Sequence, residues 1–180
     1  MRQYSVIGGI LLVVVLLSSA IPERIEWRAD QKIAWHMFKA VPNTTNGYAA
    51  TSSTGISQSY QINSNGYIDK PTIRVKAHFY PKYSWYNAKD TSAYLLAHEQ
   101  AHFDITEIHA RKLRKRITEF DFSANSKTEI KALYNEIEQE RKLMQRHFDS
   151  ASRHSRDRTQ EMRWRKEIKR LLEKYWVYTP

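Results

Sequence analysis

Residues 95–105 read Leu95-Leu96-Ala97-His98-Glu99-Gln100-Ala101-His102-Phe103-Asp104-Ile105, and they lie within a longer segment, 91–120, that predicts a helix. The apolar residues that indicate its buried stripe are Leu95, Ile105, Ile108, Leu113, Ile117 and Phe120. On such a helix His98 and His102 are one turn apart, so their imidazoles can point at one ion. The stretch therefore predicts a long helix that carries a metal-binding pair.

Zinc (Zn²⁺) suits this geometry, because its Zn–N distance of about 2.1 Å fits two imidazoles on neighbouring turns. Glu99 follows His98 and lies about 100° further round the helix, within reach of a water molecule at the metal rather than of the metal itself. This H-E-x-x-H pattern is typical of zinc hydrolases, with the Glu as general base. The alternative is a hydrogen-bonded histidine pair between packed helices.

A catalytic zinc ion usually has three protein ligands, so another residue is needed. The chain contains no Cys, which leaves His, Asp and Glu as candidates and excludes disulfide bonds. His109 shares the face of His98 and His102, but it lies about 10 Å beyond His102 along the axis, too far to share the ion. Glu107 points to the opposite face. The third ligand must come from another element.

A second helix is predicted after residues 121–125, because Ser126 and Glu129 form a capping-box pattern. If this helix runs antiparallel to the first, its far end returns level with His98. Residues at that end are His147, Asp149 and His154, and residues in the middle are Glu136, Glu138 and Glu140. The far group is favoured. His154 lies at a helix break, where a side chain can be aimed freely, but the pattern alone leaves His147 and Asp149 open beside it.

Residues 21–86 form short β-like pieces at 32–38, 48–62 and 72–80. Asn65-Gly66 predicts a hairpin turn into the last piece. There the buried face would carry Ile73, Val75, Ala77 and Phe79, and the basic outer residues suit an edge strand that an extended peptide could join. We therefore expect an α+β fold, with a small antiparallel sheet followed by a three-helix C-terminal half.

Two further helix starts follow from the sequence. Asp90 or Thr91 can cap the first helix, and Asp157 can cap a third helix. The apolar residues that this third helix would bury are Trp164, Ile168, Leu171 and Tyr175.

Residues 1–20 resemble a secretory signal peptide, which makes residues 21–180 the mature domain. Arg2 is followed by an apolar run at 6–17 and by Ser18-Ser19-Ala20, the small residues expected at a cleavage site. We expect an exported protein, periplasmic or secreted. The run is shorter than the ~20 residues that span a bilayer, so an uncleaved membrane anchor is the alternative.

A family resemblance rests on residues 95–105 and, downstream, on Phe148, Asp149, His154, Ser155, Gln160 and Trp164. Together they resemble a bacterial family of predicted secreted zinc-dependent proteases, catalogued as the domain of unknown function number 922. The resemblance runs from the Trp27 region to about Trp164. It implies a zincin-like fold. The histidine of the downstream family signature corresponds to His154, and the resemblance therefore makes His154 the preferred third ligand. The chain departs from that signature at Phe148, Ser152 and Ser155, where the family has Tyr, Thr and Gly.

The net charge is +10, with many Lys and Arg residues in the predicted helices. Such a surface can hold an anionic cell-envelope polymer or lipid head groups, or it can be a solvated set of helix faces. Export argues against nucleic acid as a partner.

We therefore expect a secreted zinc metallopeptidase acting on peptides or proteins, with His98, His102 and His154 as metal ligands and Glu99 as general base. A zinc-stabilised, catalytically inactive cell-envelope binding protein is the alternative, and a basic helical module without metal is the third hypothesis.

Overall fold

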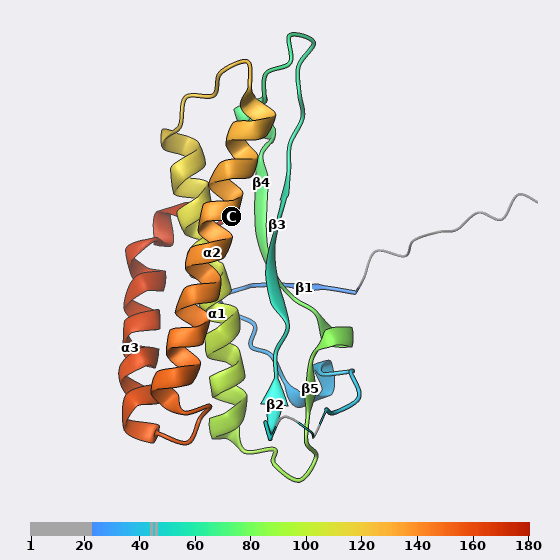
Figure 1. Ribbon diagram of the computed structural model, residues 1–180, viewed down its shortest axis with the longest axis vertical. Helices are drawn as coiled ribbons and strands as arrows, with labels where there is room; N and C mark the ends of the chain where they lie inside the picture. Colours follow the sequence, from blue (N-terminus) through green and yellow to red (C-terminus); the bar gives the residue numbers. More distant parts are fainter. Residues whose placement is uncertain (1–22, 44, 46) are drawn as a thin grey trace, which may run out of the picture.

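The computed structural model describes residues 23–43, 45 and 47–180, so the predicted signal peptide lies outside the described residues. Figure 1 shows three helices on one side and short strands on the other. The elements in chain order are β1 (Ile25–Glu26), η1 (Trp35–Met37), β2 (Ala50–Thr51), β3 (Thr54–Ser59), η3 (Lys70–Thr72), β4 (Arg74–Phe79), η4 (Pro81–Tyr83), β5 (Trp85–Tyr86), α1 (Ala93–Glu119), α2 (Ser126–Ser152), α3 (Arg158–Lys174) and η5 (Trp176–Tyr178). This α+β order confirms the predicted fold class. In the part of the chain that the structure describes, no helix is long and apolar enough to cross a bilayer.

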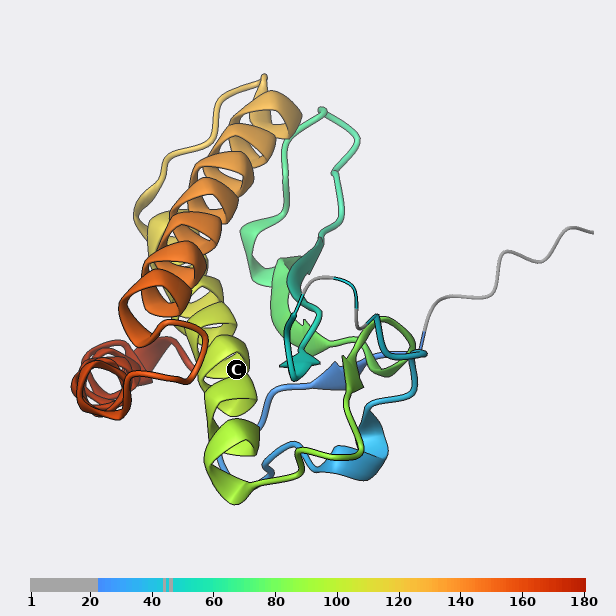
Figure 2. The same ribbon diagram turned by 60° about the horizontal axis from the view of Figure 1, so that its bottom comes forward.

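Helix α1 is the central element, and it contacts the strands as well as both other helices. Figure 2 shows it between α2 and α3 on one side and the strands on the other. Its predicted span is confirmed, but its cap is Ser92, whose hydroxyl accepts a hydrogen bond from the Leu95 amide at 3.2 Å, and not Asp90 or Thr91. The buried stripe is confirmed from Leu95 to Ile117.

Helix α2 runs antiparallel to α1, as predicted. Two ion pairs mark the register, since Lys112 meets Glu140 at 3.0 Å while Arg116, one turn later, meets Glu136 at 2.9 Å. The chain therefore turns back after Phe120, and the C-terminal end of α2 lies beside the start of α1.

The predicted capping box at the start of α2 is wrong. Ser126 is fully buried, and its hydroxyl lies 3.2 Å from both the Gly66 carbonyl and the Ile68 amide, so it fixes the hairpin tip to the helix. Glu129 accepts instead from the amide of Ser123 at 2.8 Å. The Ser126 hydroxyl, which the local pattern assigned to the helix end, therefore bonds to the hairpin that packs against the helix.

The main sheet has the order β1-β4-β3 and is antiparallel. Strand β4 is thus central, and the prediction that residues 72–80 form an edge strand is wrong. The two-residue β1 covers that edge, with Ile25 opposite Phe79. A second sheet pairs β2 with β5. The hairpin turn at Asn65-Gly66 is confirmed, because Gly66 has a φ of +84° and donates its amide to the Asn63 carbonyl at 3.0 Å.

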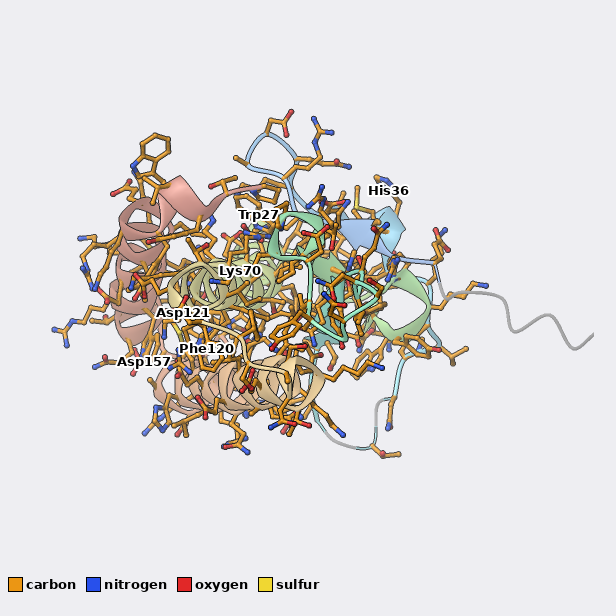
Figure 3. The ribbon with its side chains drawn as sticks, turned by 90° about the horizontal axis from the view of Figure 1, so that it is seen from above. Trp27, His36, Lys70, Phe120, Asp121 and Asp157 are labelled. Carbon is orange, nitrogen blue, oxygen red and sulfur yellow. The ribbon has the colours of Figure 1, made fainter. Side chains whose placement is uncertain are left out.

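Residues 32–38 were expected to be β-like, but they contain no strand, and Trp35–Met37 form the short 3-10 turn η1. The turn brings Ile33 and Phe38 into the core, and Trp35 packs on Tyr86 with ring centroids 4.8 Å apart. Figure 3 shows His36 of this turn on the side of the molecule away from the three helices. Aromatic packing rather than strand pairing therefore uses these apolar residues.

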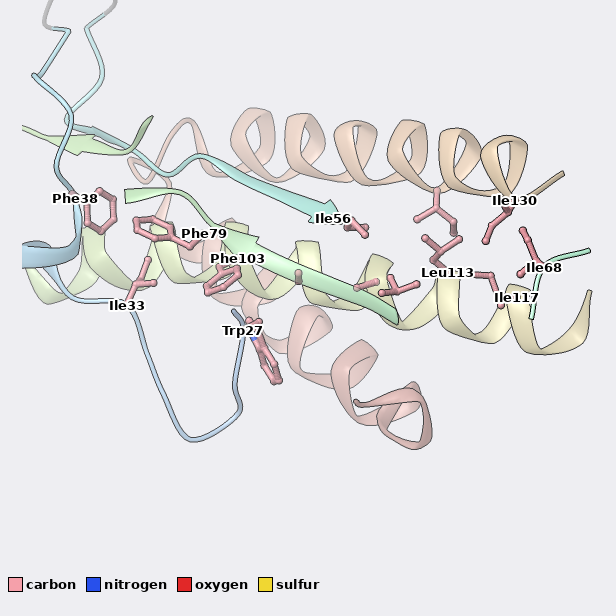
Figure 4. Close-up of a cluster of buried hydrophobic side chains, with 14 residues drawn as sticks. Trp27, Ile33, Phe38, Ile56, Ile68, Phe79, Phe103, Leu113, Ile117 and Ile130 are labelled. Carbon is pink, nitrogen blue, oxygen red and sulfur yellow. The ribbon is translucent and has the colours of Figure 1, made fainter. Parts of the chain in front are cut away.

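Two apolar clusters hold the layers together. Figure 4 shows the larger one along the sheet side of α1, from Phe38 at one end to Ile130 at the other. The smaller one joins the three helices and contains Ala101, Ile105, Ile108, Phe148 and Ile168. Helix α3 begins as predicted at Asp157, which accepts from the Gln160 amide at 3.0 Å, and its predicted stripe packs on the smaller cluster. The clusters thereby fix α1, α2 and α3 relative to one another.

Candidate metal centre

Three donor atoms converge where the start of α1 meets the end of α2. His98 Nε2 and His102 Nε2 are 3.2 Å apart, and Asp149 Oδ1 lies 3.3 Å from the first and 2.9 Å from the second. Ligand atoms at about 2.1 Å from a tetrahedral ion would be about 3.4 Å apart. The spacing of these three atoms therefore fits a small ion such as zinc.

Phe148 sets the orientation of the first histidine. The His98 ring stacks on the buried Phe148 ring, with centroids 4.6 Å apart and planes 24° from parallel. His102 meets the same ring edge-on at 5.2 Å. Because Phe148 directly precedes Asp149 on α2, one short helical segment both orients the imidazoles and supplies the carboxylate.

Gln145 sets the orientation of the second histidine. Its amide nitrogen donates to the His102 carbonyl at 2.9 Å and lies 3.3 Å from the Thr106 hydroxyl, so its amide oxygen is left to accept a hydrogen bond from His102 Nδ1. That contact makes Nδ1 the protonated nitrogen and leaves Nε2 as the atom directed at Asp149.

A buried carboxylate on α3 lies behind the first histidine. Glu161 is fully buried, and its Oε2 is 3.4 Å from His98 Nδ1 and accepts from the Tyr94 hydroxyl at 2.8 Å. Its Oε1 is 2.7 Å from Arg165. A carboxylate in this place fixes the tautomer of a metal-binding imidazole and raises its basicity.

Sequence reasoning missed Glu161, although a signal was present. Counted back from Ile168 and Trp164, position 161 falls on the apolar stripe predicted for the third helix. A carboxylate on a buried stripe needs a partner, and that requirement points toward the metal site.

The charge state of the cluster follows from these contacts. Burial lowers the pKa of His98, but the neighbouring Asp149 and Glu161 carboxylates outweigh burial and raise that pKa to about 9. Burial raises the pKa of Asp149, yet its bonds to His102 and His98 hold that pKa well below the usual range. The carboxylates thus create a local field that favours positive charge beside the imidazoles.

Glu99 is 3% exposed, and its Oε2 has no hydrogen-bond partner among the described residues. A buried carboxylate oxygen left without a partner is costly and needs an explanation, of which a functional role is one. Glu99 and the three donor residues all line one cleft of about 740 Å³. Its walls are residues 47–54, the start of α1, the last turns of α2 and the loop after them.

His154, the preferred third ligand, lies next to the convergent atoms but outside the group of His98, His102 and Asp149. Its Nδ1 is 3.6 Å from Asp149 Oδ1, its side chain is 47% exposed, and its ring packs 4.6 Å from that of Tyr48. Asp149, one of the alternatives left open, supplies the third atom instead.

The other candidates lie away from these atoms. Glu136, Glu138 and Glu140 form ion pairs with Arg116, Arg141 and Lys112, and His147 is exposed. His109 is outside the group, as predicted, and its Nδ1 bonds to the Ile105 carbonyl at 2.8 Å. Glu107 is buried against Arg111 and Arg114, where it neutralises two cations in the core.

The turn after α2 has unusual backbone geometry. Arg153, His154 and Ser155 are consecutive and have φ values of 50°, 51° and 66°. Residues with a Cβ adopt this left-handed region at a cost of about 1 kcal/mol or more each, and such strain collects at functional sites. Ser155 is the position where the downstream signature has glycine, which adopts this φ freely.

A family model described as bacterial protein of unknown function (DUF922) matches residues 25–155, which include the whole candidate metal group. No curated protein and no solved structure matches the chain significantly.

Proposed function

The chain belongs to the DUF922 family of bacterial proteins of unknown function, and we propose that it is a zinc-dependent metallopeptidase of the zincin type. The observation that carries the proposal is the convergence of His98, His102 and Asp149 within 3.3 Å of one another beside the buried carboxylate of Glu99. A structural site would need neither a cleft nor a buried oxygen without a partner.

The donor set supports zinc among the common divalent metals. Two imidazoles and one carboxylate form a ligand set found in catalytic zinc sites, which leave one position open. Magnesium and calcium prefer oxygen ligands throughout, and the two imidazoles disfavour them. Bound zinc would act as a Lewis acid on the scissile carbonyl and lower the pKa of a water molecule to about 7.

Glu99 has the position of the general base. Its Oε2 would accept the proton of the attacking water as the oxygen bonds to the carbonyl carbon, and it would return that proton to the amine nitrogen as the C–N bond breaks. Glu99 directly follows His98 in α1 and lines the same cleft as the three donor residues.

Neighbouring residues orient the two imidazoles. Glu161 and Phe148 hold the His98 ring, and Gln145 holds the His102 ring, so the donor atoms are placed before a metal arrives. The cleft between residues 47–54 and α2 would hold an extended segment of the substrate. The predicted signal at residues 1–20 supports export, which makes proteins or peptides outside the cytoplasm the expected substrates.

Metal analysis and hydrolysis test the proposal together. The purified chain should bind one zinc ion and should cleave an unfolded protein such as reduced casein in a way that a chelator abolishes. Glu99→Gln should keep the zinc ion and lose the cleavage, because Gln lacks the basicity that proton transfer needs. His98→Ala should lose metal and cleavage together.

Each negative result has a distinct meaning. Zinc binding by a parent chain that cleaves no protein would support the inactive envelope binding protein. A chain without affinity for zinc would support the basic helical module. Cleavage by Glu99→Gln at the parent's rate would remove Glu99 from the reaction.

A further inference from the structure

Several Lys and Arg residues without a carboxylate partner gather in the cleft that contains the candidate centre. Away from the cleft many other Lys and Arg residues are neutralised by carboxylates, as Lys112 is by Glu140 at 3.0 Å and Arg170 is by Glu167 at 2.6 Å. Four exposed cations on the cleft wall form no ion pair with any described residue; they are Lys142, Arg146, Arg156 and Arg158.

Acidic residues of the cleft do not cancel this charge. Glu99 and Asp149 belong to the candidate metal centre, where a bound cation would offset them. Asp90 is the remaining carboxylate among the lining residues that the structure describes. Arg141, the fifth cation of the wall, is already paired with Glu138 at 2.7 Å. The groups free to meet a substrate are therefore mainly cationic.

These cations lie on both sides of the candidate centre. Lys142 and Arg146 are seven and three residues before Asp149 on α2, or about 10 Å and 5 Å along the helix axis at 1.5 Å per residue. Arg156 and Arg158 follow the helix end. Arg156 lies 3.5 Å from the Gly47 carbonyl across one end of the cleft, and the Arg158 guanidinium lies over the Tyr94 ring at 4.8 Å.

From this arrangement we propose that the cleft selects acidic polypeptide segments. The inference rests on the proposed peptidase function and adds its substrate class. An extended peptide advances about 3.3 Å per residue, so a displacement of about 10 Å corresponds to about three residues. Glu or Asp side chains up to three residues from the scissile bond would meet Lys142 and Arg146 on one side, or Arg156 and Arg158 on the other.

The shape of the site favours a peptide over other anions. The cations line a concave cleft of about 740 Å³ that also contains Glu99, whereas a membrane surface would need them on a convex or flat face. Carboxylates spaced along an extended backbone can reach cations on both sides of the centre. Charge complementarity of this kind sets specificity and association rate more than it sets maximal affinity.

A binding experiment separates this inference from the peptidase proposal. The zinc-loaded full chain carrying Glu99→Gln is titrated against fluorescent ten-residue peptides rich in Glu, Gln or Lys, with fluorescence anisotropy as the readout. We expect the Glu-rich peptide to bind at least about tenfold more tightly than the Lys-rich peptide, with the Gln-rich peptide between them and the preference weakened by salt.

Matched charge reversals locate the effect on the chain. Lys142→Glu combined with Arg146→Glu should lower affinity for the Glu-rich peptide by about tenfold, because two attractions become repulsions. The control is Lys127→Glu combined with Lys131→Glu, which has the same spacing and charge change on the same helix, at exposed positions outside the cleft. It should change the affinity by less than about twofold.

Several results would overturn the inference. Equal losses in the two double variants would show a general field effect, and equal binding of the Glu-rich and Lys-rich peptides would show no selection. Displacement of the peptide by a single-stranded oligonucleotide or by anionic phosphatidylglycerol vesicles at matched charge concentration would show that the cleft recognises charge without a peptide backbone.

Hydrolysis by the parent chain is measured separately. Preference for the Glu-rich peptide without cleavage would leave acidic peptide recognition standing and refute the peptidase proposal. Cleavage without that preference would support the peptidase proposal and refute the selection of acidic peptides.

Discussion

The choice between Asp149 and His154 as third ligand gives the sharpest test of the metal centre. Asp149→Asn removes the negative charge but keeps the size and one oxygen of the side chain. His154→Gln removes the imidazole near Asp149 and keeps a similar side-chain volume. Asp149 Oδ1 lies within 3.3 Å of Nε2 of both His98 and His102, whereas His154 approaches Asp149 alone among these three residues, at 3.6 Å. We therefore expect Asp149→Asn to weaken zinc binding far more than His154→Gln.

The magnitude follows from the number of ligands. Structural zinc sites with four protein ligands bind with about 10–16 kcal/mol, so one ligand contributes roughly 2.5–4 kcal/mol. At 1.4 kcal/mol for each factor of ten, the loss of Asp149 as a ligand should lower zinc affinity by about 10²- to 10³-fold. A residue that only contacts a ligand typically changes affinity by about 10- to 100-fold at most, and the long contact of His154 places it at or below the lower limit.

The assay is competition for zinc with a chromophoric chelator, with the bound metal counted by elemental analysis. Thermal unfolding of both variants in chelator is the control, because a variant that unfolds early would lose zinc for an unrelated reason. A stronger loss of affinity in His154→Gln than in Asp149→Asn, with both variants folded, would refute the assignment of Asp149 and restore His154 as the third ligand.

Three further predictions concern positions around the centre. Glu161→Gln should lower zinc affinity by about 10- to 100-fold, because an amide does not raise the basicity of His98 as the carboxylate does, and it should shift the visible spectrum of the cobalt-substituted chain. An unchanged affinity and spectrum would show that Glu161 has only a packing role. Ser155→Gly should raise stability by about 1 kcal/mol and Tm by about 2–4 °C in calorimetry, since glycine relieves the strain at a φ of 66°, and a lower Tm would contradict this. Burial, opposed in part by the bond to the Ile105 carbonyl, lowers the pKa of His109 from 6.5 to about 4, so His109 stays neutral in the folded chain while it takes up a proton in the unfolded chain. The contribution of His109 to the free energy of unfolding is therefore complete above pH 6.5 and falls as pH drops toward 4, by up to roughly 3 kcal/mol. Denaturant unfolding between pH 4 and 7 should show a free energy of unfolding that rises with pH, and His109→Gln should reduce that slope. Equal slopes in the two proteins would refute the neutral state of His109 in the folded chain.

Patterns that depend on neighbours in the sequence were predicted well. The span of α1, the turn at Asn65-Gly66 and the start of α3 at Asp157 each follow from residues within one or two turns of each other. Helical spacing also brought His98 and His102 together, since a four-residue step leaves little freedom. Local physics is enough for these features.

Features that depend on distant segments were not predicted. A two-residue strand covers β4, and a pair such as Ile25-Glu26 carries no pattern that marks a strand. Ser126 has the sequence of a cap, but the hairpin tip around Gly66 competes for its hydroxyl and is favoured because the site is buried. In each case a long-range contact replaced the local use of a residue.

Identifying the third donor of the candidate metal centre needs both the local sequence pattern and a long-range contact. An antiparallel return of α2 brings its end level with His98, and this was predicted, but the rotation of α2 about its axis decides which side chain faces the histidines. Gln145 lies against His102, so the residue one turn later, Asp149, must face the same two imidazoles. The helix ends at Ser152, and the left-handed turn that follows carries His154 to the cleft wall beside Asp149. A single contact between the two helices would therefore have been enough to choose Asp149 from the sequence. Glu138 is on the same face of α2 as Gln145 and Asp149, but it lies about 16 Å before Asp149 along the helix axis, too far to share the ion.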